Sequence, residues 1–280
     1  AHAAHIPVHL GSAHMTVPAV LAELDPGPGD IVVLNDPHRG GTHLNDVTVV
    51  APLFHRGRRL GFLMDRAHHA DVGGAEPGSM GGARDLSEEG ICMGPTWLAR
   101  RGRNVKRAWN GFLGAVRDSE AGRGDLLAQC AALHRGGERF ADLVRRFGVS
   151  EVERAMVDLV DHGEKLTAAL LRSWPVGEAK ARDRLDGKGT PEIRCRVKLG
   201  RGRLTVDFSG TSAQAPGSWN THRAVVTSAV FYVLQSLSPD EIPETSGTLA
   251  RVTLKLPPDS LVSSSAPAGA ALGNVETSQR

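Results

Sequence analysis

Several features are missing from this sequence, and each absence excludes a class of protein. No apolar run approaches the roughly 20 residues of a membrane span, and the start lacks a charged and then apolar leader. The 33 basic and 31 acidic residues are spread along the whole length, so no basic stripe marks a nucleic-acid site. We therefore expect a soluble cytoplasmic protein with no membrane and no nucleic-acid partner.

Cysteine is also scarce. Cys92, Cys130 and Cys195 lie far apart and none forms a CxxC pair, which argues against a disulfide framework and a zinc knuckle. We expect all three to be inert core residues. The phosphate loop GxxxxGK[ST], the dinucleotide motif GxGxxG after a strand and the nucleophile elbow GxSxG are likewise missing. The chain thus carries no ATP-binding motif of a familiar kind.

A chain of 280 residues is long enough to bury the core of one large domain or two modest ones. We divide it into a β-rich region with a Gly-rich loop (1–122), a helical segment (123–175) and a region of hairpin, helix and strand (176–280). These regions predict a mixed α/β (α+β) fold, with β-hairpins and a mixed sheet packed with helices, as one truncated catalytic domain. Both ends read as mid-domain sequence, so we expect a fragment.

Two apolar runs near the N-terminus predict a hairpin that follows a short strand at residues 30–36. The run VTVVAPLF and its returning partner are separated by a basic turn. With a three-residue loop of Arg56, Gly57 and Arg58, counting outward pairs Asp46 with His68. A β-bulge would shift this register by one residue and undo the pairing.

Apolar residues at helical spacing follow in the middle of the chain. Residues 123–147 predict two helices, broken by Gly136-Gly137 and stopped at Gly148. Residues 151–172 predict a third, with one apolar face. That face consists of Val152, Met156, Leu159, Val160, Leu166 and Leu170.

The C-terminal part returns to a β pattern. EIRCRVKL and RLTVDFSG, joined by the turn GRG, predict a second hairpin with a three-residue turn. Residues 222–237 predict an apolar helix capped by Asn220 or Thr221, and 249–256 predict one more strand.

Histidine carries the first functional signal, since seven of the twelve lie before residue 60. His43, Asp46 and His68 provide two imidazoles and one carboxylate that the first hairpin would bring together. Such a set leaves coordination positions open and suits Zn, Mn or Fe(II), which activate a bound water or polarise a carbonyl oxygen. We predict a metal site on these residues, although His-x-x-Asp spacing also occurs in ordinary polar loops.

Other polar residues near this set are candidates for general acid and base work or for orienting the ligands: Asp36, His38, His69 and Asp71. Each taken singly is more often a capping or turn residue. Residues 73–95, rich in glycine and acids, are typical of a long functional loop. His5 and His9 could reach the same site, Asp125 has the pattern of a helix N-cap, and Glu276 is either a substrate contact or without a role.

Five stretches of the chain together resemble the hydantoinase B and oxoprolinase family, which includes the corresponding parts of acetone carboxylase, acetophenone carboxylase and caprolactamase. The stretches are NDPHRGGTHLNDVTVVAPLF, DRAHHADVGGAEPGSM, RGDLLAQ, LTVDFSGTSAQAPGSWN and GNVETSQR. In related members a His-x-x-Asp and a later His hold the metal, and these match His43, Asp46 and His68. Family members run to about twice this length.

The resemblance implies a two-component enzyme. A separate hydantoinase A type subunit or domain would use ATP to phosphorylate the carbonyl oxygen of a cyclic amide, and a chain of this kind would complete the hydrolysis as the metal-site subunit. An ATP-dependent ketone carboxylase of the acetone or acetophenone carboxylase type is the nearest alternative. A metal hydrolase that works without ATP, and a non-catalytic scaffold for the ATP-using subunit, stay open as further classes.

Overall fold

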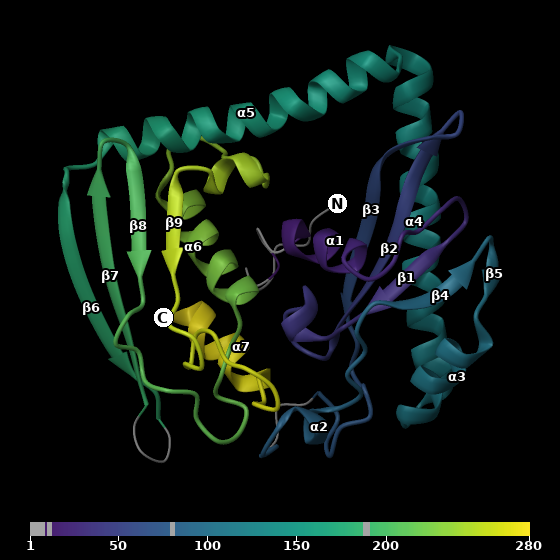
Figure 1. Cartoon of the computed structure of the whole chain (residues 1–280), viewed down its shortest axis with the longest axis horizontal. Coiled ribbons are helices and arrows are strands. Elements are labelled where there is room, and N and C mark those ends of the chain that lie inside the picture. Colours follow the sequence, from purple (N-terminus) through teal and green to yellow (C-terminus); the bar gives the residue numbers. More distant parts are fainter. Residues whose placement is uncertain (1–8, 10–12, 79–81, 187–190) are drawn as a thin grey trace. The chain divides into compact units, whose positions relative to one another are not determined.

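The computed structural model describes residue 9 and residues 13–78, 82–186 and 191–280. It has the mixed α/β class that the sequence predicts, with helices and two separate sheets (Figure 1). The chain divides into two compact units, one of residues 13–154 and the other containing 155–280. The division falls within the helix α5 (Val149–Ser173), inside the predicted helical segment 123–175.

The first unit is built on a five-stranded sheet in the order β3-β2-β1-β4-β5, with every neighbouring pair antiparallel. Its strands are β1 (Ile31–Leu34), β2 (Asp46–His55), β3 (Arg58–His68), β4 (Thr96–Arg100) and β5 (Arg103–Asn104). Its helices are α1 (Ala13–Leu21), η2 (Pro37–Arg39), α2 (Leu86–Glu89), α3 (Lys106–Ala115) and α4 (Ser119–Phe147).

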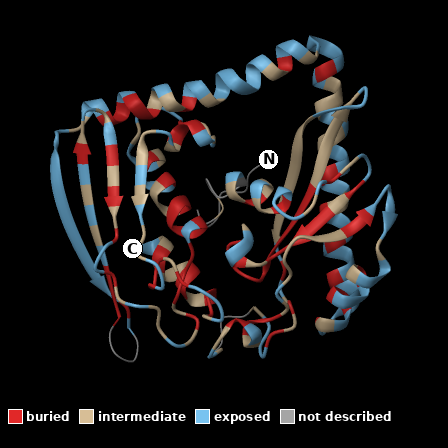
Figure 2. Cartoon of the chain, viewed as in Figure 1, coloured by how far each residue is buried: buried red, intermediate tan, exposed pale blue. Residues whose placement is uncertain are grey.

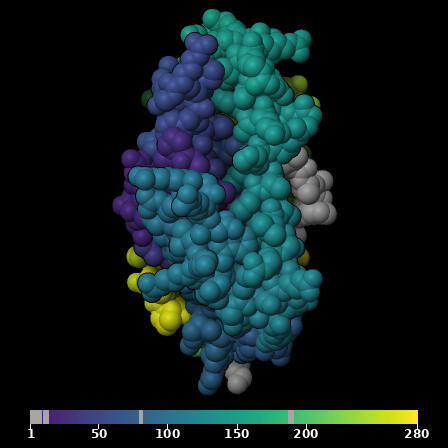
Figure 3. All heavy atoms as spheres, turned by 90° about the vertical axis from the view of Figure 1, so that its right-hand side faces the viewer, coloured from purple at the N-terminus to yellow at the C-terminus, as the bar shows by residue number. Residues whose placement is uncertain are grey.

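Helices pack against both faces of this sheet, because its central strands carry apolar side chains on each side. Val33, Val47 and Val49 share a core with α3 and α4. Val32 and Val50 point the other way and pack with Val20 of α1. Figure 3 shows α4 in teal along the surface of this unit, beside the β2–β3 hairpin. The sheet therefore has an α4 face and an α1 face.

The β2–β3 hairpin has a shorter turn than predicted and still pairs Asp46 with His68. Its loop is the two-residue Arg56-Gly57, both with positive φ, as a type I′ turn requires. That turn alone would shift the register by one residue. The register shifts back between Leu53 and Phe54, where β3 carries an extra residue, so the two departures cancel.

The helix α4 corrects the prediction of two helices broken at Gly136-Gly137, since it continues without a break to Phe147. Both glycines lie against Leu63 of β3, so they sit where the helix runs close over the sheet. A helix interior tolerates each glycine at a cost of about 1 kcal/mol, which the packing of a long helix offsets. The predicted stop at Gly148 is confirmed by its positive φ.

The second unit has a four-stranded sheet in the order β6-β7-β8-β9. The strands are β6 (Gly177–Arg184), β7 (Glu192–Gly200), β8 (Arg203–Asp207) and β9 (Val252–Lys255), of which only β8 and β9 pair in parallel. The helices are α5, α6 (Arg223–Leu237), η3 (Ser246–Leu249) and α7 (Ala271–Gln279). One face of the sheet shares a core with α5 and α6, whereas β6 is exposed along its whole length (Figure 2).

Three predictions for this unit need correction. The β7–β8 turn is the two-residue Arg201-Gly202, again with positive φ at both positions. Helix α6 begins after His222, with no side-chain cap from the predicted Asn220 or Thr221. The apolar face expected on 151–172 is buried only toward its ends, and its middle is exposed. Met156 and Leu159 are exposed, while Val152 and Leu170 are buried.

Candidate metal centre

The structure brings His43, Asp46 and His68 together at one end of the β2–β3 hairpin. One ligand atom of each lies within 4.8 Å of the others. The rings of His43 and His68 are stacked with centroids 5.0 Å apart. Within the described part of the chain, no other group of three or more His, Cys, Asp or Glu side chains meets this criterion.

A tight turn before β2 positions the first two members. The Asp46 amide donates to the His43 carbonyl, 3.0 Å away, which brings the two side chains to the same side. His43 Nδ1 lies 2.5 Å from Asp46 Oδ2, and the Thr42 hydroxyl donates to the same carboxylate oxygen. Both His43 and Asp46 are buried. The carboxylate is therefore held in a fixed orientation by groups on its own turn.

His68 completes the cluster from the neighbouring strand. Its Nδ1 lies 3.3 Å from Asp46 Oδ1, across the directly paired residues of β2 and β3. Its side chain is 54% exposed, whereas that of Asp46 is 1% exposed. The centre thus has two buried members and opens to solvent at the third.

Arg66 is a neighbour of the centre that the sequence did not single out. It lies two residues before His68 and so on the same face of β3. Its guanidinium donates to Thr48, Thr16 and the carbonyl of Gly40. Burial lowers the pKa of Arg66 and the nearby Asp46 carboxylate raises it, with a net lowering. The strand alternation was the signal that could have identified it.

His69, predicted as a catalytic residue, points to the opposite face of the sheet because it follows His68 along the chain. Its ring is fully buried and meets the edge of Phe112. Its Nε2 lies 2.9 Å from Oε1 of Gln129 on α4, and Gln129 Nε2 donates to the Val47 carbonyl, also at 2.9 Å. The backbone of His69 exchanges hydrogen bonds with Asn45.

Gln129 and Asn45 therefore bind the residues next to two of the three cluster members. Val47 follows Asp46, and His69 follows His68. The Gln129 side chain hydrogen-bonds to both Val47 and His69, so from the α4 face it links the ends of the two strands that carry Asp46 and His68. The geometry favours a positioning role for His69. RGDLLAQ, a motif from the sequence, contributes this glutamine.

The other predicted catalytic residues also lie outside the cluster. Asp36 caps η2 by accepting from the amide of His38. Asp71 accepts hydrogen bonds from the Gly73 amide and from the amide and guanidinium of Arg117. Burial alone would raise the pKa of Asp71, but these hydrogen bonds and the Arg117 charge outweigh it and lower that pKa.

Four further predicted residues have separate outcomes. His5 lies outside the described residues, and His9 is described but belongs to no candidate metal group. Asp125 is not an N-cap, because α4 begins earlier, at Ser119, capped by another aspartate. Glu276 lies on α7 and pairs with Arg280.

The three cysteines are unpaired, but they are less buried than predicted. Cys92 is exposed, and Cys130 and Cys195 are half-buried. Although the Cys92 residue is exposed overall, neighbouring protein atoms partly bury its thiol, and this desolvation, followed by the Asp36 carboxylate, raises the pKa of Cys92 to about 12. Burial also raises the pKa values of Cys130 and Cys195. All three are thiols at neutral pH, and thus poor nucleophiles.

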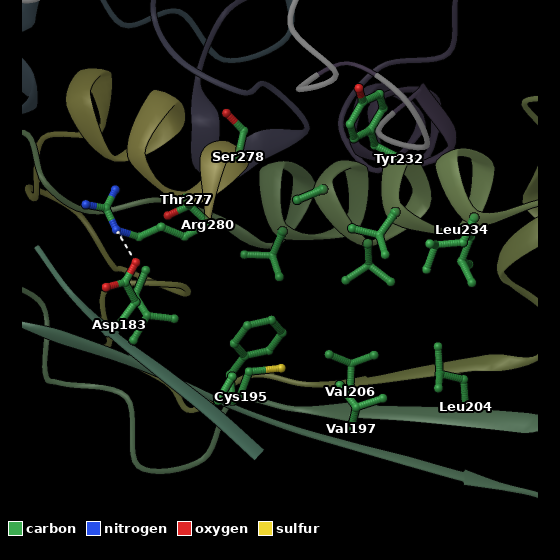
Figure 4. Close-up of a pocket in the computed structure, with 18 of the residues that line it drawn as sticks. Asp183, Cys195, Val197, Leu204, Val206, Tyr232, Leu234, Thr277, Ser278 and Arg280 are labelled. Carbon is green, nitrogen blue, oxygen red and sulfur yellow. Dashed lines mark ion pairs between the residues drawn. The ribbon is translucent and has the colours of Figure 1, made fainter. Parts of the chain in front are cut away.

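A cavity lies in the other unit, between α6 and the sheet (Figure 4). This cavity has a volume of about 370 Å³. Val197, Leu204 and Val206 line it from the sheet, and an ion pair between Arg280 and Asp183 lies at one end. It is almost wholly apolar and presents no cluster of groups for acid, base or metal chemistry.

The donor set of the centre fits a divalent cation. Two imidazoles and one carboxylate converge, the carboxylate is already oriented, and the exposed His68 leaves one side open for a further ligand. Zn, Mn and Fe(II) all accept such a set. This chain would hold the ion with His43, Asp46 and His68.

Comparison with known proteins agrees with the resemblance. The family model for hydantoinase B/oxoprolinase matches residues 1–280, so the chain belongs to the hydantoinase B/oxoprolinase family. It is 32% identical to an uncharacterized protein of Methanocaldococcus jannaschii, over all of this chain and 51% of that protein. It is also 32% identical to the 5-oxoprolinase of Saccharomyces cerevisiae, over all of this chain and 23% of the relative.

A solved structure has the same fold. The ATP-dependent caprolactamase from Pseudomonas jessenii matches with a TM-score of 0.89 and 26% identity, over 98% of this chain and 48% of that one. The chain thus spans about half the length of this structure and of the archaeal relative. In the part that the structure describes, no helix has both the length and the apolar character of a membrane span.

Proposed function

We propose that this chain supplies the metal site of an ATP-dependent cyclic amidase of the hydantoinase or 5-oxoprolinase type. The observation that carries the proposal is the convergence of His43, Asp46 and His68 at an end of the sheet that is open to solvent. The family, with relatives named as a 5-oxoprolinase and an ATP-dependent caprolactamase, supports a ring amide as the substrate. A hydantoinase A type subunit or domain would use the ATP, since no ATP-binding motif of a familiar kind occurs in these 280 residues.

The chemistry divides between the two components. The ATP-using subunit phosphorylates the amide oxygen, which makes the ring carbon an electrophile. Water then adds at that carbon, and the carbon–nitrogen bond of the ring breaks as the nitrogen takes up a proton, which leaves an acyl phosphate. A second water hydrolyses the acyl phosphate and releases inorganic phosphate and the ring-opened acid. A divalent ion in the centre would supply a Lewis acid and lower the pKa of water. The chain's own part is to fix the Asp46 carboxylate through Thr42 and His43 and to leave the exposed side of His68 free for substrate.

The test is ATP-dependent ring opening by the reconstituted complex, with 5-oxoproline and hydantoin as substrates. Asp46→Asn keeps the size of the side chain but weakens a ligand, and we expect kcat to fall by about a hundredfold or more. His55→Ala, at the far end of β2, is the matched control and should retain full activity. Equal activity of Asp46→Asn and wild type would exclude a role for the centre.

The same assay separates the alternatives. Bicarbonate-dependent consumption of acetone or acetophenone, without hydrolysis of either ring, would assign the ketone carboxylase type instead. Ring opening by this chain alone, without ATP or a partner, would assign a stand-alone metal hydrolase. Full activity of a complex that contains Asp46→Asn would instead assign this chain the role of a non-catalytic scaffold for the ATP-using subunit.

A further inference from the structure

The sheet of the second unit has a strongly basic outer face, on the side away from α6. Strand alternation gathers eight basic side chains on this face and only three acidic ones. The basic residues are Lys180, Arg182, Arg184, Arg194, Arg196, Lys198, Arg203 and Lys255. The acidic ones are Glu178, Glu192 and Asp207. The whole chain has a formal charge of only +2, so this face holds a large local excess of positive charge.

Like charges face each other directly across two neighbouring strands. Lys180 of β6 pairs with Arg196 of β7, and Arg182 pairs with Arg194. Like charges directly opposite each other on one face of a sheet destabilise it. Glu178 and Glu192 lie nearby and pair with some of these cations, but too few carboxylates are present to balance the face.

Protection of an exposed strand edge explains only part of this charge. Edge strands often carry lysine and arginine to prevent pairing with another chain, and β6 is such an edge. Arg194, Arg196 and Lys198 lie on β7, which is hydrogen-bonded to a strand on each side. Edge protection therefore does not account for the charge on β7, and the repulsion across the strands calls for an anionic surface that relieves it.

We propose that this outer face docks an acidic surface of the ATP-using partner subunit. The proposal rests on the proposed function, which requires such a subunit. The four strands have eight, nine, five and four residues. At about 3.3 Å per residue and about 4.8 Å between strands, the face covers roughly 400 Å², against about 800 Å² per partner in a standard interface. The face is thus large enough to form about half of one partner's side of such an interface.

The composition of the face favours a protein over a nucleic acid. Its residues on β6 to β9 include no aromatic side chain on which a base could stack. Glu178, Glu192 and Asp207 interrupt the positive charge at positions where a phosphate backbone would meet repulsion. Mixed charge with one sign in excess is instead typical of complementary protein surfaces.

The test measures binding of the 280-residue chain to the ATP-using subunit, with a variant designed to keep the fold. Lys180→Glu/Arg182→Glu places opposite charges across from Arg196 and Arg194, so its Tm should equal or exceed that of wild type. We expect the Kd of this variant for the ATP-using subunit to rise at least tenfold above that of wild type. Arg135→Glu/Arg139→Glu on α4 changes the charge equally in the other unit and should bind as wild type does.

Salt and a nucleic-acid probe complete the design. Wild-type binding should weaken several-fold between about 50 and about 300 mM NaCl, and binding of the β6 variant should depend less on salt. Equal Kd values for the β6 variant and wild type would overturn docking at this face and leave the metal centre intact. Tighter binding of wild type to a duplex DNA probe than to the subunit, lost in the same variant, would also overturn it. Failure of wild type to bind the subunit would overturn both the docking at this face and the two-component assignment. The metal site is tested by a separate measurement, the metal content of the chain, and does not depend on this result.

Discussion

Replacing Gln129 with alanine tests whether the α4 face of the sheet supports the metal centre. The substitution removes two buried hydrogen bonds, one to the Val47 carbonyl and one with the His69 ring, each 2.9 Å long. The loss of each hydrogen bond leaves a buried polar group without its partner, which costs about 1–3 kcal/mol. For the two bonds together we expect a loss of about 2–6 kcal/mol in the free energy of unfolding. The strand ends beside Asp46 and His68 lose their common anchor, and metal affinity should fall about 10- to 100-fold.

Urea denaturation measures the first effect, and titration with Zn²⁺ or Co²⁺ at a temperature where the variant is folded measures the second. Gln235→Ala is the matched control, since the Gln235 side chain donates to the Ile242 carbonyl in the other unit. It should lower stability without changing metal affinity. If folded Gln129→Ala binds metal as tightly as wild type, the reasoning that the glutamine positions the ligands is wrong.

Two further substitutions test local features. Gly247→Ala would place a Cβ in severe overlap with the Val160 carbonyl oxygen, so we expect a loss of about 3 kcal/mol or more in unfolding free energy. Gly111→Ala, in open space on α3, is the control and should be neutral or stabilising. Thermal melts measure both variants, and equal losses would refute the steric argument. The hydrogen bonds of Asp71 with Arg117 and its neighbours lower the pKa of the carboxyl, so their contribution, about 1–3 kcal/mol, is present above the ordinary pKa near 4 and is lost as pH falls through the lower folded value. The stability difference between wild type and Asp71→Asn should therefore narrow below about pH 4, and a constant difference from pH 7 to pH 2 would contradict this.

The prediction that Asp46 pairs with His68 is correct, although the three-residue turn on which it rested is not present. The hairpin was visible in the alternating apolar pattern, but its turn and its bulge were not. Arg-Gly is not among the usual signals for a type I′ turn, yet Arg56-Gly57, Arg101-Gly102 and Arg201-Gly202 all adopt positive φ at both positions. Glycine supplies the second position, and arginine accepts strain at the first because the paired strands fix the turn.

Helix boundaries were harder to predict, because tertiary packing decides them. Gly136-Gly137 looked like a break, and only the contact with Leu63 reveals that α4 continues across the sheet. Asp125 matched a capping pattern, but Asp118 caps the helix by accepting from the amides of Glu120 and Ala121. Local signals of this kind cannot tell which of two aspartates starts a helix.

The roles of neighbouring residues also depended on the fold. His68 and His69 are equivalent by composition, and strand alternation sends one to the metal centre and the other into the α4 core. The basic outer face of β6 and β7 was invisible to a charge count, since the charges alternate with apolar residues along each strand. Only the register between the strands places the like charges side by side.

Metal content of the purified chain tests the central claim most directly. Wild type and His55→Ala, loaded with Zn²⁺, Mn²⁺ or Fe²⁺ and passed through gel filtration, should retain about one ion per chain. His43→Ala and Asp46→Ala should lose it while they remain folded by circular dichroism. A folded wild-type chain that retains no metal, or variants that retain as much as wild type, would contradict the account.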